Sequence, residues 1–161
     1  MNPEHCSTLE TPIGLITILA DDQLISEITF EARDNEDKHE NELTKLAAQQ
    51  LTSYFAGTLK TFDLPLKQTG TDFQQDVWRS LLSIDYATTL SYARFSEHKP
   101  LAIRAIAAAN GKNKLAVVIP CHRVIGSNGK LVGYAGGLWR KKWLLQHERD
   151  VAQQGQTELK F

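Results

Sequence analysis

The chain has 161 residues, of which 42% are hydrophobic and 23% are charged, and its formal net charge is −1. This length and composition favour a globular protein of one domain or two small ones. No apolar run reaches membrane-spanning length, the N-terminus lacks the pattern of a signal peptide, and the two cysteines match no zinc spacing or disulfide framework. We therefore expect a cytoplasmic protein in a reducing compartment, without a membrane partner.

Charge is divided unevenly along the chain. Residues 1–70 hold 5 Lys/Arg and 12 Asp/Glu, whereas residues 71–161 hold 13 and 7. An acidic first half followed by a basic second half suggests that only the second half meets a polyanion such as nucleic acid. A chance division of solvated charge is the alternative.

The first half has the pattern of a scaffold. Alternating apolar residues over 11–30 predict a β-hairpin or meander, and a strongly charged loop follows over 31–42. One helical face of apolar residues over 43–55 then predicts a helix that ends near Gly57. None of these segments carries a recognisable chemical motif.

A domain boundary is predicted within residues 63–70, which have linker character, and it gives domains 1–68 and 69–161. A capping box of Thr71 and Gln74 opens the next helix. The predicted buried side chains of that helix are those of Phe73, Val77, Trp78, Leu81 and Leu82.

Two short helices then form a candidate helix-turn-helix. Ser91 caps the first, and Pro100 opens a second, alanine-rich helix over 101–109 that carries a single arginine, Arg104. Small side chains would let this helix approach the minor groove of DNA, where one long side chain can act as a wedge. The alternative is a buried helix whose arginine makes a salt bridge. A turn over 126–130 could form a wing, and an amphipathic helix is expected from about Leu138 to Glu148.

The apolar run over 115–119 predicts a buried strand, which Pro120 would end because proline has no N–H for a sheet partner. Cys121 follows at once, beside His122 and Arg123. A thiol is a strong nucleophile only as the thiolate, and neighbouring cationic or basic groups favour that form. The simpler alternative is that Cys121 is a small buried hydrophobe.

A histidine beside a reactive thiol needs a group to orient it. Glu148 is the candidate, because its spacing from Leu138, Lys141 and Leu145 places all four on one face of the last helix. Glu97 and Asp150 are rivals with an exposed pattern.

Three motifs together resemble the methylated-DNA–protein-cysteine methyltransferases, also called O6-alkylguanine-DNA alkyltransferases. They are Pro-Cys-His-Arg-Val over 120–124, Gly-Tyr-Ala-Gly-Gly over 133–137 and Trp-Leu-Leu-Gln-His-Glu over 143–148. The resemblance covers about residues 71–149 well and the front half only in outline. It implies an α+β fold: a small ribonuclease H-like sheet-plus-helix domain followed by a winged-helix catalytic domain.

The resemblance also implies direct DNA repair in a single turnover. Cys121 would accept the alkyl group from O6-alkylguanine in duplex DNA after the base is flipped out through the minor groove, with O4-alkylthymine as a second candidate substrate. His122 would deprotonate the thiol through a water and Glu148 would orient His122. Further catalytic roles are implied for Asn113, which ties the helix-turn-helix to the site, Tyr92, which protonates guanine N3, and Lys141, which favours the thiolate.

Binding roles follow from the same resemblance. Tyr134 and the backbone near Val124 would wall the guanine pocket, and Arg104 would fill the vacated place in the base stack. The remaining DNA contacts are assigned to Tyr92, Ala102, Arg123 and Ser127. The implied partner is double-stranded DNA bound by a monomer. With only His5, Cys6 and His39 available in the front half, we expect neither a metal nor a cofactor.

The chain departs from the family pattern in places. Ile84-Asp85-Tyr86-Ala87 stands where the family usually has Ile-Pro-x-Gly, and Ala107 and Ala108 stand where it has glycines. A cysteine hydrolase would share the Cys-His-acid chemistry, and a winged-helix regulator would share the helix pair. Alkyltransferase-like lesion-binding proteins lack the cysteine, so Cys121 argues against that class.

Overall fold

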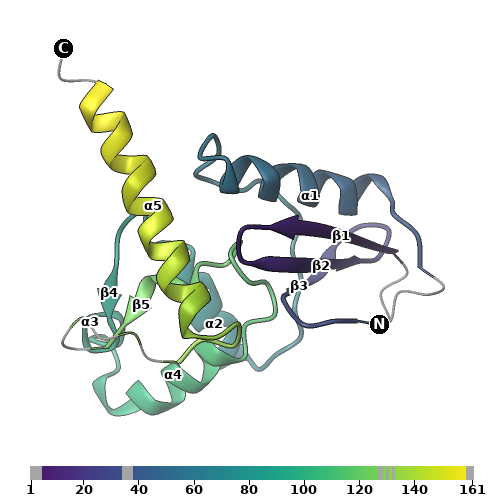
Figure 1. The fold of residues 1–161 in the computed structure, drawn as a ribbon. Helices are drawn as coiled ribbons and strands as arrows, with labels where there is room; N and C mark the ends of the chain where they lie inside the picture. The colour runs from purple at the N-terminus through teal and green to yellow at the C-terminus, as the bar shows by residue number, and fades with distance from the viewer. Residues whose placement is uncertain (1–4, 34–37, 127–128, 130, 132, 159–161) are drawn as a thin grey trace. The chain divides into compact units, whose positions relative to one another are not determined.

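The computed structural model describes residues 5–33, 38–126, 129, 131 and 133–158, with side chains up to residue 154 (Figure 1). The chain divides into two compact units. One comprises residues 1–69 and 114–118, and the other comprises residues 70–113 and 119–161. Residues 114–118 thus return to the first unit, which the predicted division into 1–68 and 69–161 did not include.

The first unit contains an antiparallel sheet in the order β1 (His5–Thr11), β2 (Gly14–Ala20) and β3 (Ile25–Thr29). The predicted meander over 11–30 corresponds to β2 and β3. Strand β1 was missed because most of its side chains are polar, so its alternation of apolar and polar residues is weak. The core of this unit lies on the β2 residues Ile16, Ile18 and Ala20, all 0% exposed.

Helix α1 (Glu42–Phe55) packs against β1 and β2 (Figure 1). It begins at Asn41, whose side chain accepts from the Thr44 N–H at 2.8 Å, while the Thr44 hydroxyl receives the Asn41 N–H at 3.1 Å. Its residues Leu51 and Tyr54 are fully buried. The helix predicted over 43–55 is therefore confirmed, and Gly57, with a φ of 83°, follows its end.

The apolar run over 115–119 is buried, as predicted, but it is not a strand. Its first residue makes an isolated bridge to Ile28 of β3. Val117 then has a left-handed φ of 70°, and the Val118 N–H donates to the Ala116 carbonyl at 2.8 Å, which closes a tight turn. A short apolar run identifies burial, but it does not determine whether the backbone is extended or turned.

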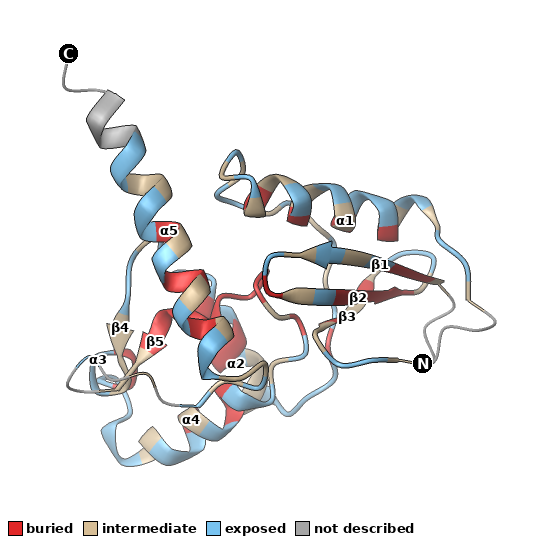
Figure 2. Cartoon of the chain, in the orientation of Figure 1, coloured by how far each residue is buried: buried red, intermediate tan, exposed pale blue. Residues whose placement is uncertain are grey.

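The second unit begins with α2 (Asp72–Leu81), whose predicted capping box is present: Gln74 N–H donates to the Thr71 hydroxyl at 3.1 Å. Val77, Trp78 and Leu81 are buried, and Figure 2 shows buried positions in red along α2. The prediction was wrong for Leu82, which is 54% exposed because the helix ends one residue earlier.

The predicted helix pair follows as α3 (Tyr92–Phe95) and, after a 3-10 turn η1 (Pro100–Ala102), α4 (Ile103–Gly111). The Ser91 hydroxyl accepts from the Arg94 N–H at 3.1 Å, which confirms the predicted cap. Helix α4 is fixed to α2 by the Trp78 indole, which donates to the Ala109 carbonyl at 2.8 Å. This bond is buried, so it holds the end of α4 firmly.

Two short parallel strands, β4 (Leu90–Ser91) and β5 (Val124–Ile125), join the helix pair to the segment that follows Cys121. Helix α5 (Leu138–Glu158) ends ten residues beyond the predicted end. The sequence pattern does not predict these last turns, because they are polar and carry no apolar periodicity. No described helix is both long and apolar enough to cross a membrane. Of the predicted wing over 126–130, residues 127, 128 and 130 lie outside the described residues.

Candidate active site

Cys121 opens a single 3-10 turn, η2 (Cys121–Arg123). The Cys121 N–H donates to the Ile119 carbonyl at 2.8 Å, and the Arg123 N–H donates to the Pro120 carbonyl at 3.0 Å. Cys121 is only 8% exposed. The hydrogen bonds fix the backbone of the turn, and the low exposure keeps Cys121 nearly closed off from bulk water.

The environment of the thiol favours its protonated form at rest. Burial raises the pKa of the Cys121 thiol, while a hydrogen bond from Asn113 and the positive charge of Lys141 lower it. Asn113 also donates from Nδ2 to the Ile119 carbonyl at 3.1 Å. Because burial is the largest influence, a base must take the proton before the sulfur can act as a nucleophile.

His122, the next residue in the same turn, is the candidate for that base. It is fully buried, and its Nε2 lies 2.8 Å from Oε2 of Glu148. Burial raises the pKa of the Glu148 carboxyl, but hydrogen bonds and charge from His122 and Arg123 outweigh burial and hold that pKa well below its ordinary value. An ionised carboxylate only accepts hydrogen bonds, so Nε2 carries the proton and Nδ1 is the basic nitrogen.

The basic nitrogen of His122 is itself buried and has no hydrogen-bond partner among the described residues. Burial also lowers the pKa of His122, so the ring is neutral and able to accept a proton near neutral pH. The rival carboxylates are elsewhere on the surface: Glu97 pairs with Arg94 at 3.6 Å, and Asp150 accepts from Gln146 at 2.8 Å. Of the three candidates, only Glu148 lies against His122.

The structure does not support the predicted DNA contact of Arg123. Arg123 is 7% exposed, and its Nε and Nη2 donate to Oε1 and Oε2 of Glu148 at 2.9 and 3.1 Å. Its Nη1 donates to the Ile84 carbonyl at 2.7 Å, and its guanidinium lies 5.6 Å from the centre of the Tyr86 ring. Arg123 therefore neutralises and orients Glu148 from inside the unit. Residue type alone gave no sign that the arginine faces inward.

Ala87 occupies the position where the family usually has glycine, and it keeps a conformation that favours glycine, with a φ of 61°. Its N–H donates to Oε1 of Glu148 at 3.1 Å. The altered loop thus still supplies a backbone donor to the carboxylate. A side chain in this left-handed region costs about 1–2 kcal/mol.

Replacing Ala87 with glycine should therefore stabilise the protein. We expect Ala87→Gly to raise the free energy of unfolding by about 0.5–1 kcal/mol, since the relief of strain exceeds the added entropy of the unfolded chain. Urea unfolding followed by circular dichroism measures this difference. As a control, Ala105→Gly on the exposed face of α4 should destabilise the protein; stabilisation by both changes would contradict the role of φ.

The Lys141 side chain hydrogen-bonds to the backbone of Val124, a contact that the sequence does not predict. The Lys141 side chain is completely buried, and its Nζ donates to the Val124 carbonyl at 2.6 Å. Burial lowers the pKa of this lysine, while the neighbouring Cys121 raises it. A buried ammonium group beside the thiol favours the thiolate electrostatically.

Two tyrosines lie close enough to Cys121 to interact with it electrostatically. Burial raises the pKa of Tyr134 well above its ordinary value, and the Cys121 charge adds to this shift. Burial likewise raises the pKa of Tyr92. A hydrogen bond from Asn110 lowers this pKa, and the interaction with Cys121 raises it further. The sequence predicted both tyrosines but not Asn110.

The exposed residues of η1 and α4 are mostly small, apart from Leu101, and include one cation, Arg104. Along η1 and α4 the exposed residues are Pro100, Leu101, Arg104, Ala105, Ala108 and Gly111, and Ala102 is half-buried. Arg104 therefore points to solvent rather than into a buried salt bridge, as the predicted wedge requires. The predicted contact residue Ser127 lies outside the described residues.

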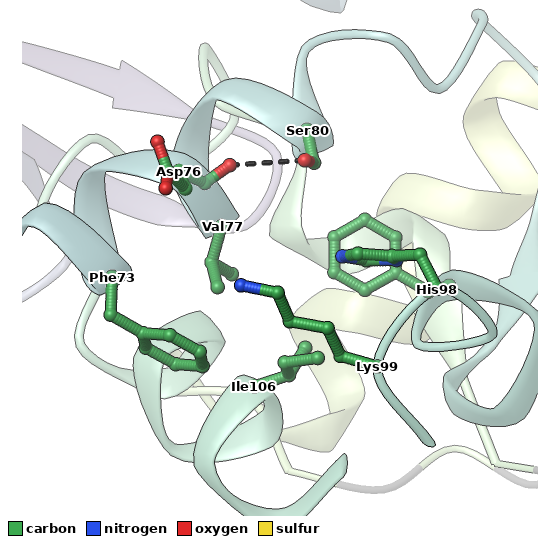
Figure 3. A pocket seen from close by; sticks show the side chains of 8 residues that line it. Phe73, Asp76, Val77, Ser80, His98, Lys99 and Ile106 are labelled. Atoms are coloured by element: carbon green, nitrogen blue, oxygen red, sulfur yellow. Dashed lines mark hydrogen bonds between the residues drawn. The ribbon is translucent and has the colours of Figure 1, made fainter. Parts of the chain in front are cut away.

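Two hollows in the second unit are separate from the thiol. One is lined by α2, α3 and α4, with Lys99 above the Phe73 ring (Figure 3). Its volume of about 30 Å³ suits a water molecule rather than a base. The other, about 290 Å³, lies beside Ala87, Leu145 and Arg149. Within the described residues, no group of three or more His, Cys, Asp or Glu side chains could hold a metal ion.

A buried thiol beside a histidine–glutamate pair, in one compact unit with a pair of short helices, is the arrangement expected of a DNA-binding protein with thiol chemistry. Two family models match the chain. The ribonuclease-like domain of 6-O-methylguanine DNA methyltransferase matches residues 5–68, and its DNA binding domain matches residues 72–150.

Known relatives agree over nearly the whole length. The methylated-DNA–protein-cysteine methyltransferase of Mycobacterium tuberculosis H37Rv is 41% identical over 155 residues, covering 92% of this chain and 94% of the relative. That of Methanosarcina acetivorans is 42% identical over 153 residues, covering 89% and 97%. The crystal structure of M. tuberculosis OGT in complex with DNA is 39% identical, with a TM-score of 0.82 and coverage of 91% and 94%. The chain belongs to the methylated-DNA–protein-cysteine methyltransferase family.

Proposed function

We propose that this protein repairs DNA by transferring the alkyl group of O6-alkylguanine to Cys121. The observation that carries the proposal is the buried Cys121 with a neutral, unpartnered His122 Nδ1 in the same turn, oriented by Glu148. This arrangement lies within the region that matches the DNA binding domain of the family.

The reaction is one displacement at the alkyl carbon. Sγ of Cys121 forms a bond to that carbon while the bond from the carbon to O6 of guanine breaks, and the electrons of the broken bond remain on the base. The thiol proton passes through a bridging water to Nδ1 of His122, and Tyr92 donates its proton to N3 of the leaving guanine. Proton return from His122 through solvent to Tyr92 completes the balance.

The product is a thioether, which is a stable form of the cysteine. We therefore propose that each molecule acts once. O4-alkylthymine offers the same alkyl–oxygen bond, and we propose it as a second substrate class.

Base flipping explains how a buried thiol meets an atom inside a duplex. The exposed face of α4 carries small side chains that permit close approach to the minor groove, and Arg104 extends from it to replace the extruded base. Tyr134 and the backbone around Val124 would then line the site that receives the guanine. We propose that a monomer performs the repair.

Mass spectrometry of the protein after incubation with duplex O6-methylguanine DNA tests this function. We expect one methyl group per molecule, on the peptide that contains Cys121, and none in Cys121→Ala. Cys6→Ala removes the other free cysteine, which lies in the first unit, and should still be methylated. Turnover without modification, or DNA binding without transfer, would overturn the proposal in favour of a hydrolase or a binding protein.

Arg104→Ala should impair repair of duplex DNA by about tenfold, because the extruded base would leave an unfilled gap in the stack. Reaction with free O6-benzylguanine, which needs no flipping, should be almost unchanged. Single-turnover rates on both substrates measure the difference. Arg79→Ala removes another exposed arginine, on α2, and serves as the charge-matched control. Equal losses on both substrates would contradict the wedge role of Arg104.

The rate of transfer should fall in acid as His122 becomes protonated. Burial lowers the pKa of His122 below its ordinary value of 6.5, so its neutral form persists to lower pH than that of a free histidine. We therefore expect a constant rate near neutral pH and a decline with a midpoint below 6.5. Transfer rates measured in quenched single-turnover reactions across the acid pH range give this midpoint. A midpoint above pH 6.5 would exclude His122 as the buried base.

A further inference from the structure

Asn110 lies in the last turn of α4 and is 4% exposed. Its Nδ2 donates a hydrogen bond of 2.6 Å to the phenolic oxygen of Tyr92, the first residue of α3. We propose that Asn110 is the positioning residue that keeps the phenolic proton of Tyr92 free for N3 of the alkylated guanine. This inference rests on the proposed function, in which Tyr92 protonates the leaving base.

The direction of this hydrogen bond determines where the phenolic proton can go. A tyrosine hydroxyl has one proton to donate and lone pairs that accept. Because Asn110 donates to the oxygen, the oxygen acts as the acceptor and its own proton is not used on Asn110. The proton can then be donated to an acceptor that enters the site.

The burial of the amide favours this direction. Oδ1 of Asn110 is buried and has no hydrogen-bond partner among the described residues. Turning the amide over would instead bury the unpartnered NH₂ group, which has two donors in place of one carbonyl. Buried N–H groups without partners are rarer in proteins than buried carbonyls without partners. The turned amide would also withhold the phenolic proton.

The end of α4 links the acid to the nucleophile. The Asn110 carbonyl accepts from the Asn113 N–H at 3.3 Å, and the Asn113 side chain hydrogen-bonds to the Cys121 thiol. The preceding carbonyl, that of Ala109, is fixed by Trp78. One anchored helical turn therefore positions both Tyr92 and the segment that supports the sulfur.

The same hydrogen bond assists the loss of the proton. Burial raises the pKa of Tyr92, and Cys121 raises it further, whereas the hydrogen bond from Asn110 lowers it. A donor to the phenolic oxygen stabilises the phenolate that forms as the proton leaves. Asn110 thus directs the proton and also makes it easier to give up.

The test compares two duplex substrates, one with O6-methylguanine and one with 3-deaza-O6-methylguanine. In the second, a C–H group replaces N3, so Tyr92 has nothing to protonate. Asn110→Asp keeps the shape of the side chain but offers only acceptors, and it should capture the phenolic proton. Asn110→Leu removes the hydrogen bond and leaves the hydroxyl free to rotate.

On O6-methylguanine we expect about a 100-fold slower transfer for Asn110→Asp and about tenfold for Asn110→Leu, within the range of general-acid catalysis. On the 3-deaza substrate both variants should match the unmodified protein. Combining Asn110→Asp with Tyr92→Phe should give no loss beyond that of Tyr92→Phe alone, because both changes remove the same proton transfer.

Equal losses on the two substrates would show a merely structural role and overturn the inference. If Asn110→Asp does not fold, Asn110→Leu carries the same comparison, and the alkylation rate of Cys121 by iodoacetamide reports the integrity of the site. Failure of the unmodified protein to react with O6-methylguanine DNA would instead refute the proposed function. The two failures are therefore distinguishable.

Discussion

Glu148→Gln should slow alkyl transfer by about 10²- to 10⁴-fold, the range expected when a general base is lost. The carboxylate accepts from His122 Nε2, and this bond places the proton on Nε2 and leaves Nδ1 basic. A glutamine NH₂ group facing the ring would donate instead, and the proton would move to Nδ1. His122 would then be unable to accept the proton of Cys121.

The same change should destabilise the fold. Arg123 is 7% exposed and makes two hydrogen bonds to Glu148, so a neutral partner leaves a buried guanidinium without its counter-charge. Breaking a buried ion pair costs about 3–5 kcal/mol. Thermal unfolding at neutral pH and single-turnover transfer below the melting temperature measure the two effects separately.

Glu97→Gln is the matched control for both measurements. Glu97 lies in the same unit, but its side chain is 70% exposed and its ion pair with Arg94 is on the surface. We expect a change in stability of less than about 0.5 kcal/mol and an unchanged rate. A folded Glu148→Gln protein that transfers alkyl groups at the normal rate would remove Glu148 from the relay.

Lys141→Met should make the thiol of Cys121 less acidic. Burial raises the pKa of Cys121 and the buried ammonium group lowers it, so removing that charge should raise the pKa further and slow reactions that depend on the thiolate. The pH dependence of Cys121 alkylation by iodoacetamide reports this shift directly, and it should move to higher pH. Methionine retains most of the buried volume.

Lys142→Met provides the comparison, because Lys142 is the neighbouring residue on α5 and is exposed. It should leave the pH profile of Cys121 unchanged. An unaltered profile in Lys141→Met would mean that the lysine serves only to hold the Val124 carbonyl. Loss of that hydrogen bond alone should lower stability by about 1–3 kcal/mol without altering the acidity of the thiol.

Local signals in the sequence predicted much of the fold. The capping box of Thr71 and Gln74, the Ser91 cap and the apolar spacing over 43–55 each act within a few residues, and each is present. The helical spacing of Glu148 also correctly predicted its inward face. These features depend on residues that are close together in the sequence, so the sequence shows them directly.

The sequence does not predict contacts in which a residue's partner is distant in the chain. Arg123 meets a carboxylate 25 residues away, and the hydroxyl partner of Asn110 is 18 residues away. Neither pairing leaves a periodic pattern. The run over 115–119 was interpreted as a strand because hydrophobicity reports burial, whereas its turn at Val117 depends on packing that the sequence does not show.

The excursion of residues 114–118 into the first unit limits how far the two halves can be exchanged between proteins. These residues use the backbone of Ile28 as a hydrogen-bond partner: the Ile28 N–H donates to the Lys114 carbonyl at 2.9 Å, and the Ala116 N–H donates to the Ile28 carbonyl at 3.1 Å. A fragment that begins at residue 69 retains every group of the proposed chemistry but loses this partner just before the reactive turn. A chain that lacks the first half would therefore leave the Lys114 carbonyl and the Ala116 N–H without these partners, a few residues before Cys121.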